Sequence, residues 1–316
     1  MKIVFMGTPD FAVQPLKALI ENGHEIALVV TKEDKPKGRG YEMSFTPVKE
    51  EALANGVEIF QPTTLNTEEV YEKLKSIDAE LYVVVAYGKI LPQKILDLPR
   101  LGCINIHASL LPSYRGAAPI QWAIIDGCKK TGITTMLMDS GLDTGDILKK
   151  YEINIEDDET GGSLFEKLAL LGAKAIVDTI ENLDNIVPVK QKDTDTKYAS
   201  VLQKSMGNID FSKDRDYIER LVRGLSPWPG AYSSLRGKNI KLLKVSKVDV
   251  ANIKYKNRTD MAMIFSKVPA ISAGVYTTNL VKAAPVLWDR KITDSETYVN
   301  AIVINSGIAN ACTKDE

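Results

Sequence analysis

The chain has two histidines, and one of them stands where proton transfer could take place. His107 ends the apolar run 103–107, which predicts a β-strand, and the strand period of two puts Asn105 and His107 on the same face. A histidine beside a carboxamide at the carboxyl end of a strand could act as an acid or base next to an oxyanion donor. The pair could equally be structural and satisfy loop carbonyls. His24 lies in the turn 22–25 and is interpreted as a solvated residue.

A second polar cluster follows another apolar run. Residues 138–146 (MDSGLDTGD) hold three carboxylates and two glycines. A carboxylate there could orient the imidazole or favour its protonated form. Turns rich in Asp and Gly are common. That simpler interpretation explains Gly141 and Gly145, but it does not explain three acids.

The turn after the first predicted strand limits which ligands the fold could hold. It reads Gly7-Thr8-Pro9-Asp10, and the sequence contains neither a GxGxxG fingerprint nor a P-loop lysine. NAD or ATP phosphates are therefore not bound in those known ways. In open α/β sheets, ligands bind beyond the carboxyl ends of the strands, which is where residues 105–107 and 139–146 would lie.

Short apolar runs alternate with segments of helical period over residues 1–183, and this pattern predicts an α/β fold. The run LYVVVA at 81–86 is uniformly apolar, as expected of a strand buried on both faces. Strands interleaved with helices predict a Rossmann-like, mainly parallel sheet with helices on both faces. We expect strands at 3–6, 25–30, 57–60, 81–86, 103–106, 133–138 and 146–153, and helices at 8–20, 46–54, 68–77 and within 161–183.

Composition sets further limits. The 316 residues suffice for about two domains. No apolar run is long enough for a membrane span, and three scattered cysteines support neither a disulfide framework nor a zinc ribbon, so we expect a cytoplasmic protein. Forty basic against 41 acidic residues leave a net charge of −1, so any contact with nucleic acid must be local.

The periodicity is lost over residues 184–206, which we interpret as a linker to a second unit. There we expect a helix at 214–225, a rigid Pro-Trp-Pro-Gly turn and a hairpin of 231–235 with 239–245. The pattern changes again after about residue 251. Short strand-like runs then appear at 261–265, 274–278 and 301–304.

Several spaced motifs agree in order with one enzyme family. They are the opening MKIVFMGTPDFAV, the loop DKPKGRG, the stretch HASLLPSYRGAAPIQWAI, the LDTGD turn, and PWPGAY beyond the linker. From residue 1 to about 248 the chain resembles the 10-formyltetrahydrofolate-dependent formyltransferases, and among these the methionyl-tRNA formyltransferases. The resemblance implies a catalytic domain at 1–183 and an OB-like β domain that is truncated here to 207–250.

The resemblance also implies roles for single residues. Asn105, His107 and Asp143 correspond to the catalytic set of the family. The substrate's α-amine attacks the formyl carbon carried by 10-formyltetrahydrofolate, and no metal is required. The folate would be lined by Ser109, Leu110, Leu111 and Pro112.

The expected function is formylation of initiator methionyl-tRNA in translation initiation, with no membrane and no obligate protein partner. Two alternatives stay open. One is the same chemistry on another amine, such as glycinamide ribonucleotide or an amino-sugar nucleotide. The other is an impaired chimera that binds folate without transferring the formyl group.

Two basic segments are candidates for contact with tRNA. The loop 31–43 is rich in Lys and Arg, as in the family, but has Tyr41-Glu42 where basic residues usually follow GRG. Residues 236–258 carry eight Lys or Arg against one Asp. Either segment could simply be a solvated surface. The predicted contacts are Lys35, Lys37, Arg39, Lys238 and Lys241.

The resemblance ends near residue 250. Residues 252–316 instead resemble the N-terminal part of ornithine acetyltransferase (glutamate N-acetyltransferase), through AGVYTTNLVKAAPV and AIVINSGIANACT. The threonine at which that family cleaves itself lies further downstream, so we expect no acetyltransferase activity. We expect this foreign segment to fold poorly or to pack as a makeshift cap on exposed strand edges.

Overall fold

The computed structural model describes residues 1–37, 42–192, 197–235, 238–247, 261–271 and 298–305. The chain divides into two compact units, Met1–Leu202 and Gln203–Glu316. The predicted catalytic residues all belong to the first unit.

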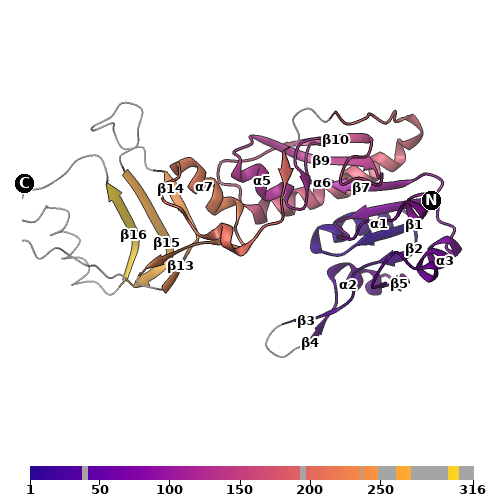
Figure 1. The fold of residues 1–316 in the computed structure, drawn as a ribbon, viewed down its shortest axis with the longest axis horizontal. Helices are drawn as coiled ribbons and strands as arrows, with labels where there is room; N and C mark the ends of the chain where they lie inside the picture. Colours follow the sequence, from indigo (N-terminus) through magenta and orange to yellow (C-terminus); the bar gives the residue numbers. More distant parts are fainter. Residues whose placement is uncertain (38–41, 193–196, 236–237, 248–260, 272–297, 306–316) are drawn as a thin grey trace, which may run out of the picture. The chain divides into compact units, whose positions relative to one another are not determined.

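The first unit is built on a seven-stranded sheet with the order β10-β9-β7-β6-β1-β2-β5 (Figure 1). Five adjacent strands run parallel to one another, namely β5, β2, β1, β6 and β7, and β9 is antiparallel to both of its neighbours. The predicted mainly parallel, Rossmann-like sheet is therefore confirmed. The strands are β1 (Lys2–Gly7), β2 (Glu25–Val30), β5 (Ile59–Phe60), β6 (Leu81–Val85), β7 (Cys103–His107), β9 (Lys130–Leu137) and β10 (Ile147–Asn154).

Helices cover both faces of this sheet, because its central strands alternate between two cores. On β1, Ile3 and Phe5 join a core with side chains of α1, α2, α5 and α6, whereas Val4 and Met6 join one with α3 and α4. None of the helices in the described ranges combines the length and the hydropathy needed to cross a membrane. The helices are α1 (Val13–Glu21), α2 (Pro47–Ala54), α3 (Glu68–Ser76), α4 (Gln93–Leu96), α5 (Pro119–Ile125) and α6 (Gly161–Glu181).

Threonine side chains cap the starts of α2, α3 and α6, whereas α1, α4 and α5 begin without a side-chain cap. Thr46 caps α2 by accepting the N–H three residues on, at the predicted start of that helix. Thr8 does not cap a helix, because its hydroxyl donates to the carbonyl oxygen of Tyr87 at 3.2 Å. A short 3₁₀ turn, η1 (Asp10–Ala12), intervenes, and α1 begins only at Val13. The predicted start of this helix at residue 8 was wrong.

The polar segment 184–206 packs mostly within the first unit, which runs to Leu202. Val189 and Ile147 accept each other's N–H at 2.8 and 2.9 Å. Further along, β11 (Tyr198–Ala199) pairs in parallel with β8 (Arg115–Gly116). The described parts of this segment, residues 184–192 and 197–202, form a strap across loops of the first unit, and contacts with those loops take the place of a periodic buried face.

The second unit contains the predicted helix and hairpin. α7 (Arg215–Gly224) is capped by Asp214, and β12 (Ala231–Leu235) pairs antiparallel with β13 (Lys238–Leu242). A separate sheet joins three further strands in the order β14-β15-β16. The predicted run 274–278 lies outside the described residues. The bounds are β14 (Val245–Lys247), β15 (Met261–Ile271) and β16 (Tyr298–Asn305).

Candidate active site

The carboxyl end of β7 carries two of the predicted catalytic residues. Asn105 and His107 lie two positions apart on this strand, so both face the same side. The His107 side chain is only 7% exposed, and its Nε2 lies 2.9 Å from the carbonyl oxygen of Tyr114. A carbonyl can only accept, so Nε2–H donates in this contact. The other ring nitrogen, Nδ1, is turned toward Asp143.

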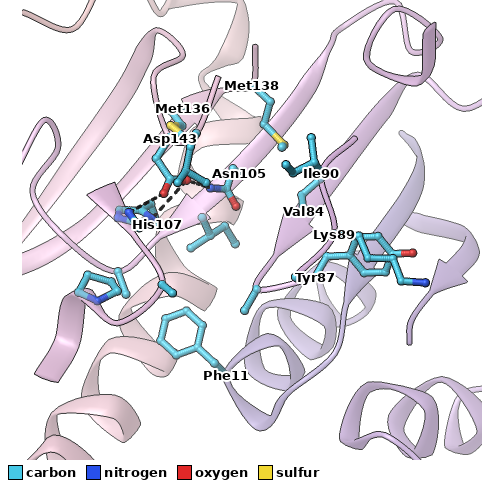
Figure 2. A pocket seen from close by; sticks show the side chains of 18 of the residues that line it. Phe11, Val84, Tyr87, Lys89, Ile90, Asn105, His107, Met136, Met138 and Asp143 are labelled. Carbon is cyan, nitrogen blue, oxygen red and sulfur yellow. Dashed lines mark hydrogen bonds and ion pairs between the residues drawn. The ribbon is translucent and has the colours of Figure 1, made fainter. Parts of the chain in front are cut away.

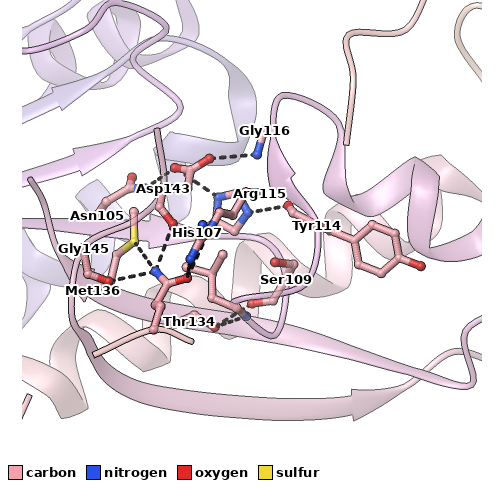
Figure 3. Close-up of polar contacts among 12 residues, drawn as sticks. Asn105, His107, Ser109, Tyr114, Arg115, Gly116, Thr134, Met136, Asp143 and Gly145 are labelled. Carbon is pink, nitrogen blue, oxygen red and sulfur yellow. Dashed lines mark hydrogen bonds and ion pairs between the residues drawn. The ribbon is translucent and has the colours of Figure 1, made fainter. Parts of the chain in front are cut away.

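Asp143 reaches this pair from the turn between β9 and β10 (Figure 3). Its Oδ1 lies 3.5 Å from Asn105 Nδ2 and 3.7 Å from His107 Nδ1. Its Oδ2 accepts the N–H of Gly116 at 2.9 Å. The backbone of Asp143 is left-handed, with φ of +53°, a conformation that Asp adopts more readily than most residues. The structure thus gathers the three predicted catalytic side chains around one carboxylate oxygen.

The ring of His107 is suited to a positive charge. With Nε2–H donating to Tyr114, a second proton on Nδ1 would make both nitrogens donors that face acceptors. The Asp143 carboxylate would then balance that charge. The separations at Asp143 Oδ1 are longer than ordinary hydrogen bonds, and catalytic contacts of this kind commonly tighten when substrate is bound.

The acids of the 138–146 turn have different tasks. Asp139 Oδ1 accepts the Gly141 N–H at 3.0 Å and the Thr144 hydroxyl at 2.7 Å, so this acid builds the turn. Asp143 faces the histidine instead. A Cβ at Gly145 would lie 1.7 Å from the Leu137 carbonyl oxygen, so only glycine fits at that position.

A cavity of about 600 Å³ opens beside Asn105, His107 and Asp143 (Figure 2). Small-molecule sites commonly measure about 300–1,000 Å³. The sequence interpretation did not single out its apolar walls, because apolar residues at strand ends are indistinguishable from core residues by pattern alone. These walls include Phe11, Val84, Ile90, Leu91, Met136 and Met138.

Ser109, Leu110, Leu111 and Pro112 are not among the residues that line this cavity. Ser109 is fully buried, and its hydroxyl donates to the carbonyl oxygen of Ser113 at 2.6 Å. The N–H of Leu111 donates to Thr134 Oγ1 at 3.0 Å. In this structure the four residues shape the turn that follows His107, and their contact with folate stays a prediction.

Tyr114 fixes the histidine through its backbone and is anchored through its side chain. Its φ is +60°, and its hydroxyl donates to Asp126 at 2.9 Å and lies 3.0 Å from Cys128 Sγ. Burial, with these two neighbours, raises the pKa of the Tyr114 hydroxyl, which therefore stays a donor. No sequence pattern indicates this role, because it is the main-chain carbonyl of Tyr114 that contacts His107.

Two of the predicted tRNA contacts have side chains that the structure describes, one in each unit. Lys35 is exposed on β3 (Lys35–Lys37), which pairs with β4 (Glu42–Ser44), and Lys241 is exposed on β13. Arg39 and the side chains of Lys37 and Lys238 lie outside the described residues.

Comparison with known proteins decides the family. The formyl transferase family matches residues 1–180, and the C-terminal domain of formyl transferases matches residues 201–268. The chain belongs to the formyl transferase family. The predicted resemblance is therefore confirmed, and with it a formyl-transferring enzyme.

Curated relatives align over most of the chain. A protein of Lachnospira eligens is 52% identical over 80% of this chain and 80% of its own length. One from Caldanaerobacter subterraneus subsp. tengcongensis is 53% identical over 79% of this chain and 82% of its own length. Both are named methionyl-tRNA formyltransferase.

Solved structures share the fold at low identity. A sugar N-formyltransferase from Shewanella is 20% identical, with a TM-score of 0.59 over 79% of this chain and 99% of that one. An N-formyltransferase from Helicobacter canadensis, solved with folinic acid and dTDP-3-aminofucose, is 19% identical, with a TM-score of 0.62 over 84% of this chain and 95% of that one. These likenesses establish the fold of the formyltransferases for this chain.

The end of the chain matches a different family. The ArgJ family matches residues 245–316, as the resemblance to ornithine acetyltransferase predicted, and this match overlaps the formyl transferase match over 245–268. β14 pairs with β15, and β15 with β16, whose residues lie in the ArgJ match alone. All three strands lie within the ArgJ match, and β14 and most of β15 lie where the two matches overlap.

Proposed function

We propose that this chain transfers the formyl group of 10-formyltetrahydrofolate to the α-amine of initiator methionyl-tRNA in the cytoplasm. The observation that carries the proposal is the pair of relatives named methionyl-tRNA formyltransferase, at 52% and 53% identity over about four fifths of the chain. Asn105, His107 and Asp143 meet at one cavity within that aligned part, which gives the assigned chemistry a place to occur.

The cavity suits a folate. 10-Formyltetrahydrofolate carries a flat pyrimidine ring and a benzoyl ring, and the walls around Phe11, Val84 and Met138 offer apolar contact to such groups. Solved neighbours with the same fold were crystallised with folinic acid or with tetrahydrofolic acid. When bound, 10-formyltetrahydrofolate supplies the formyl carbon, and the residues of this chain supply orientation and proton transfer.

Asn105 and His107 would stabilise charge. When an amine attacks a formyl carbon, the formyl oxygen gains negative charge, and donors placed beforehand beside that oxygen lower the barrier. Asn105 Nδ2 is one such donor. The second would be the Nδ1–H of a charged His107, shared between the formyl oxygen and Asp143 Oδ1 at 3.7 Å, since Nε2 donates to Tyr114.

Asp143 would manage the proton that the reaction must move. The attacking amine loses one proton, and the nitrogen that leaves the formyl carbon gains one, so the net balance is zero. Asp143 Oδ1 lies 3.5 Å from Asn105 Nδ2 and 3.7 Å from His107 Nδ1. It could accept the amine proton while it keeps the imidazole in place. Its Oδ2 is occupied by the Gly116 N–H.

The tRNA would be held by basic residues outside this cavity. Lys35 and Lys241 are exposed on two-stranded ribbons, where long side chains can reach phosphates. Lys37, Arg39 and Lys238 complete the proposed set. Residues 109–112 would line the folate from the turn that follows His107, which they shape.

Initial rates of formylation with three acceptors test the proposal. We expect kcat/KM for charged initiator methionyl-tRNA to exceed that for glycinamide ribonucleotide and for an amino-sugar nucleotide by about a hundredfold or more, since remote binding contacts raise kcat/KM. Preference for either small amine would overturn the substrate assignment. Binding of 5-formyltetrahydrofolate with no transfer to any acceptor would instead support the impaired-chimera alternative.

A further inference from the structure

Gln191 lies in the strap (residues 184–192 and 197–202) and contacts both loops that carry the candidate site. Its Nε2 donates to the carbonyl oxygens of Asp143 at 2.9 Å and Gly145 at 2.8 Å. Its Oε1 accepts from Arg115 Nε at 3.0 Å and Arg115 Nη2 at 2.9 Å. One side chain thus ties the Asp143 turn to the loop that follows His107 (Figure 3 shows Arg115, Asp143 and Gly145).

Only an amide of this length fits the pattern. The two loop carbonyls require donors, and the guanidinium of Arg115 requires an acceptor. A carboxylate would accept from Arg115 but would place an oxygen against the carbonyl oxygens of Asp143 and Gly145. An apolar side chain would bond neither Arg115 nor these carbonyls. The strap holds the Gln191 amide in place, because Val189, two residues before Gln191, exchanges main-chain hydrogen bonds with Ile147.

The Asp143 turn needs such support. The residues just before Asp143, Gly141 and Leu142, are exposed, and Asp143 itself has the left-handed φ of +53°. A left-handed backbone persists in a residue other than glycine when its surroundings hold it there. The Gln191 amide bonds the main chain of Asp143 and of the residue two positions on, so it constrains where the Asp143 carboxylate points.

We propose that Gln191 is a positioning residue, which holds the carboxylate of Asp143 against His107 through the main chain of the turn. The proposal rests on the proposed function of Asp143 in formyl transfer. Gln191 reaches no substrate in this role and acts through Asp143 alone. The segment that the sequence marks as a linker then belongs to the catalytic apparatus.

The substitutions Gln191→Met and Gln191→Glu test the proposal. Both keep the length of the side chain, and both remove the two N–H donors. We expect kcat on methionyl-tRNA to fall about 10- to 100-fold in each variant, because a misplacement of about 1 Å costs that much in rate, with KM for each substrate changed by less than about threefold. The control is Val187→Ala, on the same strap and 80% exposed, which should keep wild-type kcat.

Two further readouts separate positioning from mere structural support. In an Asp143→Asn background, Gln191→Met should cost less than about a further twofold, because two residues that act as one unit are not additive. The chain has only two histidines. At one fixed pH the ¹⁵N resonances of the His107 ring should therefore shift in Gln191→Met while those of His24 stay in place.

Three outcomes would overturn the proposal: wild-type kcat in Gln191→Glu, a full independent loss in the Asp143→Asn background, or unchanged His107 resonances. If Gln191→Met does not fold, the isosteric Gln191→Glu gives the same readouts. A wild-type chain that does not formylate methionyl-tRNA would count against the proposed function. The His107 resonances would still report on Gln191 in that case.

Discussion

At the scale of single residues, the candidate site combines a histidine held by a direct hydrogen bond with a carboxylate that lies slightly beyond hydrogen-bond distance of it. His107 is buried and its Nε2 donates to Tyr114, whose own hydroxyl is anchored by Asp126. Asp143 is held through Oδ2 by the Gly116 N–H, while its Oδ1 lies 3.5 Å from Asn105 and 3.7 Å from His107. In the proposed mechanism, the donors would stay preorganised and Oδ1 would close this short distance.

His107→Ala should lower kcat for formyl transfer by about 10²–10³ or more, the usual size for loss of one preorganised donor. His24→Ala is the matched control, because His24 lies in the turn that leads into β2, away from the lining of the cavity. Steady-state rates at saturating folate and tRNA measure the effect. A His107→Ala enzyme with near wild-type turnover would remove His107 from the mechanism.

At the scale of elements, the sequence predicts what local burial dictates. Buried strands give apolar runs, so the strands from β1 to β10 of the main sheet were located to within a few residues, and the period of two placed Asn105 beside His107. The strap was not predicted, because it is held in place by hydrogen bonds to residues distant in sequence, such as that of Gln191 with Asp143. A tertiary hydrogen bond leaves no periodic trace in the sequence.

Thr8 illustrates the same limit at a helix start. A Thr-Pro pair predicts a cap followed by a first-turn proline. The Thr8 hydroxyl instead donates to the carbonyl oxygen of Tyr87, which lies just after the neighbouring strand β6. The predicted helix at 46–54 is confirmed as α2, where the Thr46 hydroxyl accepts the Lys49 N–H at 3.2 Å and also shares a hydrogen bond with Thr31 at 2.8 Å. Here the distant contact adds to the cap and does not replace it.

The loop after β2 is tied down by an ion pair whose effect depends on pH. Asp34 accepts hydrogen bonds from the Lys49 ammonium and from Gln61, and the side chains of Asp34 and Lys49 are only 16% and 15% exposed. The hydrogen bond from Lys49 lowers the pKa of the Asp34 carboxyl below its usual 3.8. A carboxyl whose pKa is lower in the folded state stabilises the fold above pH 3.8, and that contribution is lost as the pH falls below it.

Asp34→Asn should therefore lower the free energy of unfolding by about 1–2 kcal/mol at pH 7, since the bond involves charged groups that are mostly buried. The difference from wild type should shrink as the pH falls through 3.8. Urea unfolding of both proteins between pH 3 and pH 7 measures it. Glu58→Gln is the control: its ion pair with Lys73 is exposed, and its loss should cost less than about 0.5 kcal/mol. A difference independent of pH would show that Asp34 contributes by packing alone.

At the scale of the whole molecule, charge balance restricts how a polyanion is held. The net charge is −1, so attraction to tRNA must come from local basic groups such as Lys35 and Lys241. These stand in different units, Lys35 in Met1–Leu202 and Lys241 in Gln203–Glu316. In the proposed function, folate would bind to the first unit alone, whereas tRNA would contact both units.

Two truncations separate these requirements. A chain ending at residue 205 keeps Gln191 and β11, whose Ala199 carbonyl accepts the N–H groups of Ala117 and Ala118 at 2.8 and 3.3 Å. A chain ending at residue 183 loses both. We expect the longer chain to bind 5-formyltetrahydrofolate within about threefold of the full protein, and the shorter chain to bind at least about tenfold more weakly, because the loops around Asp143 and Gly116 then lack their strap.

Calorimetric titration with 5-formyltetrahydrofolate checks the binding, and thermal melts establish whether each truncated chain is folded. With methionyl-tRNA, the chain ending at 205 should show a KM at least about tenfold higher than the full protein, and that difference should narrow as salt is raised and phosphate contacts are screened. Equal folate affinity in the two truncated chains would mean that the cavity is complete without residues 184–202, and that the strap serves only to join the units.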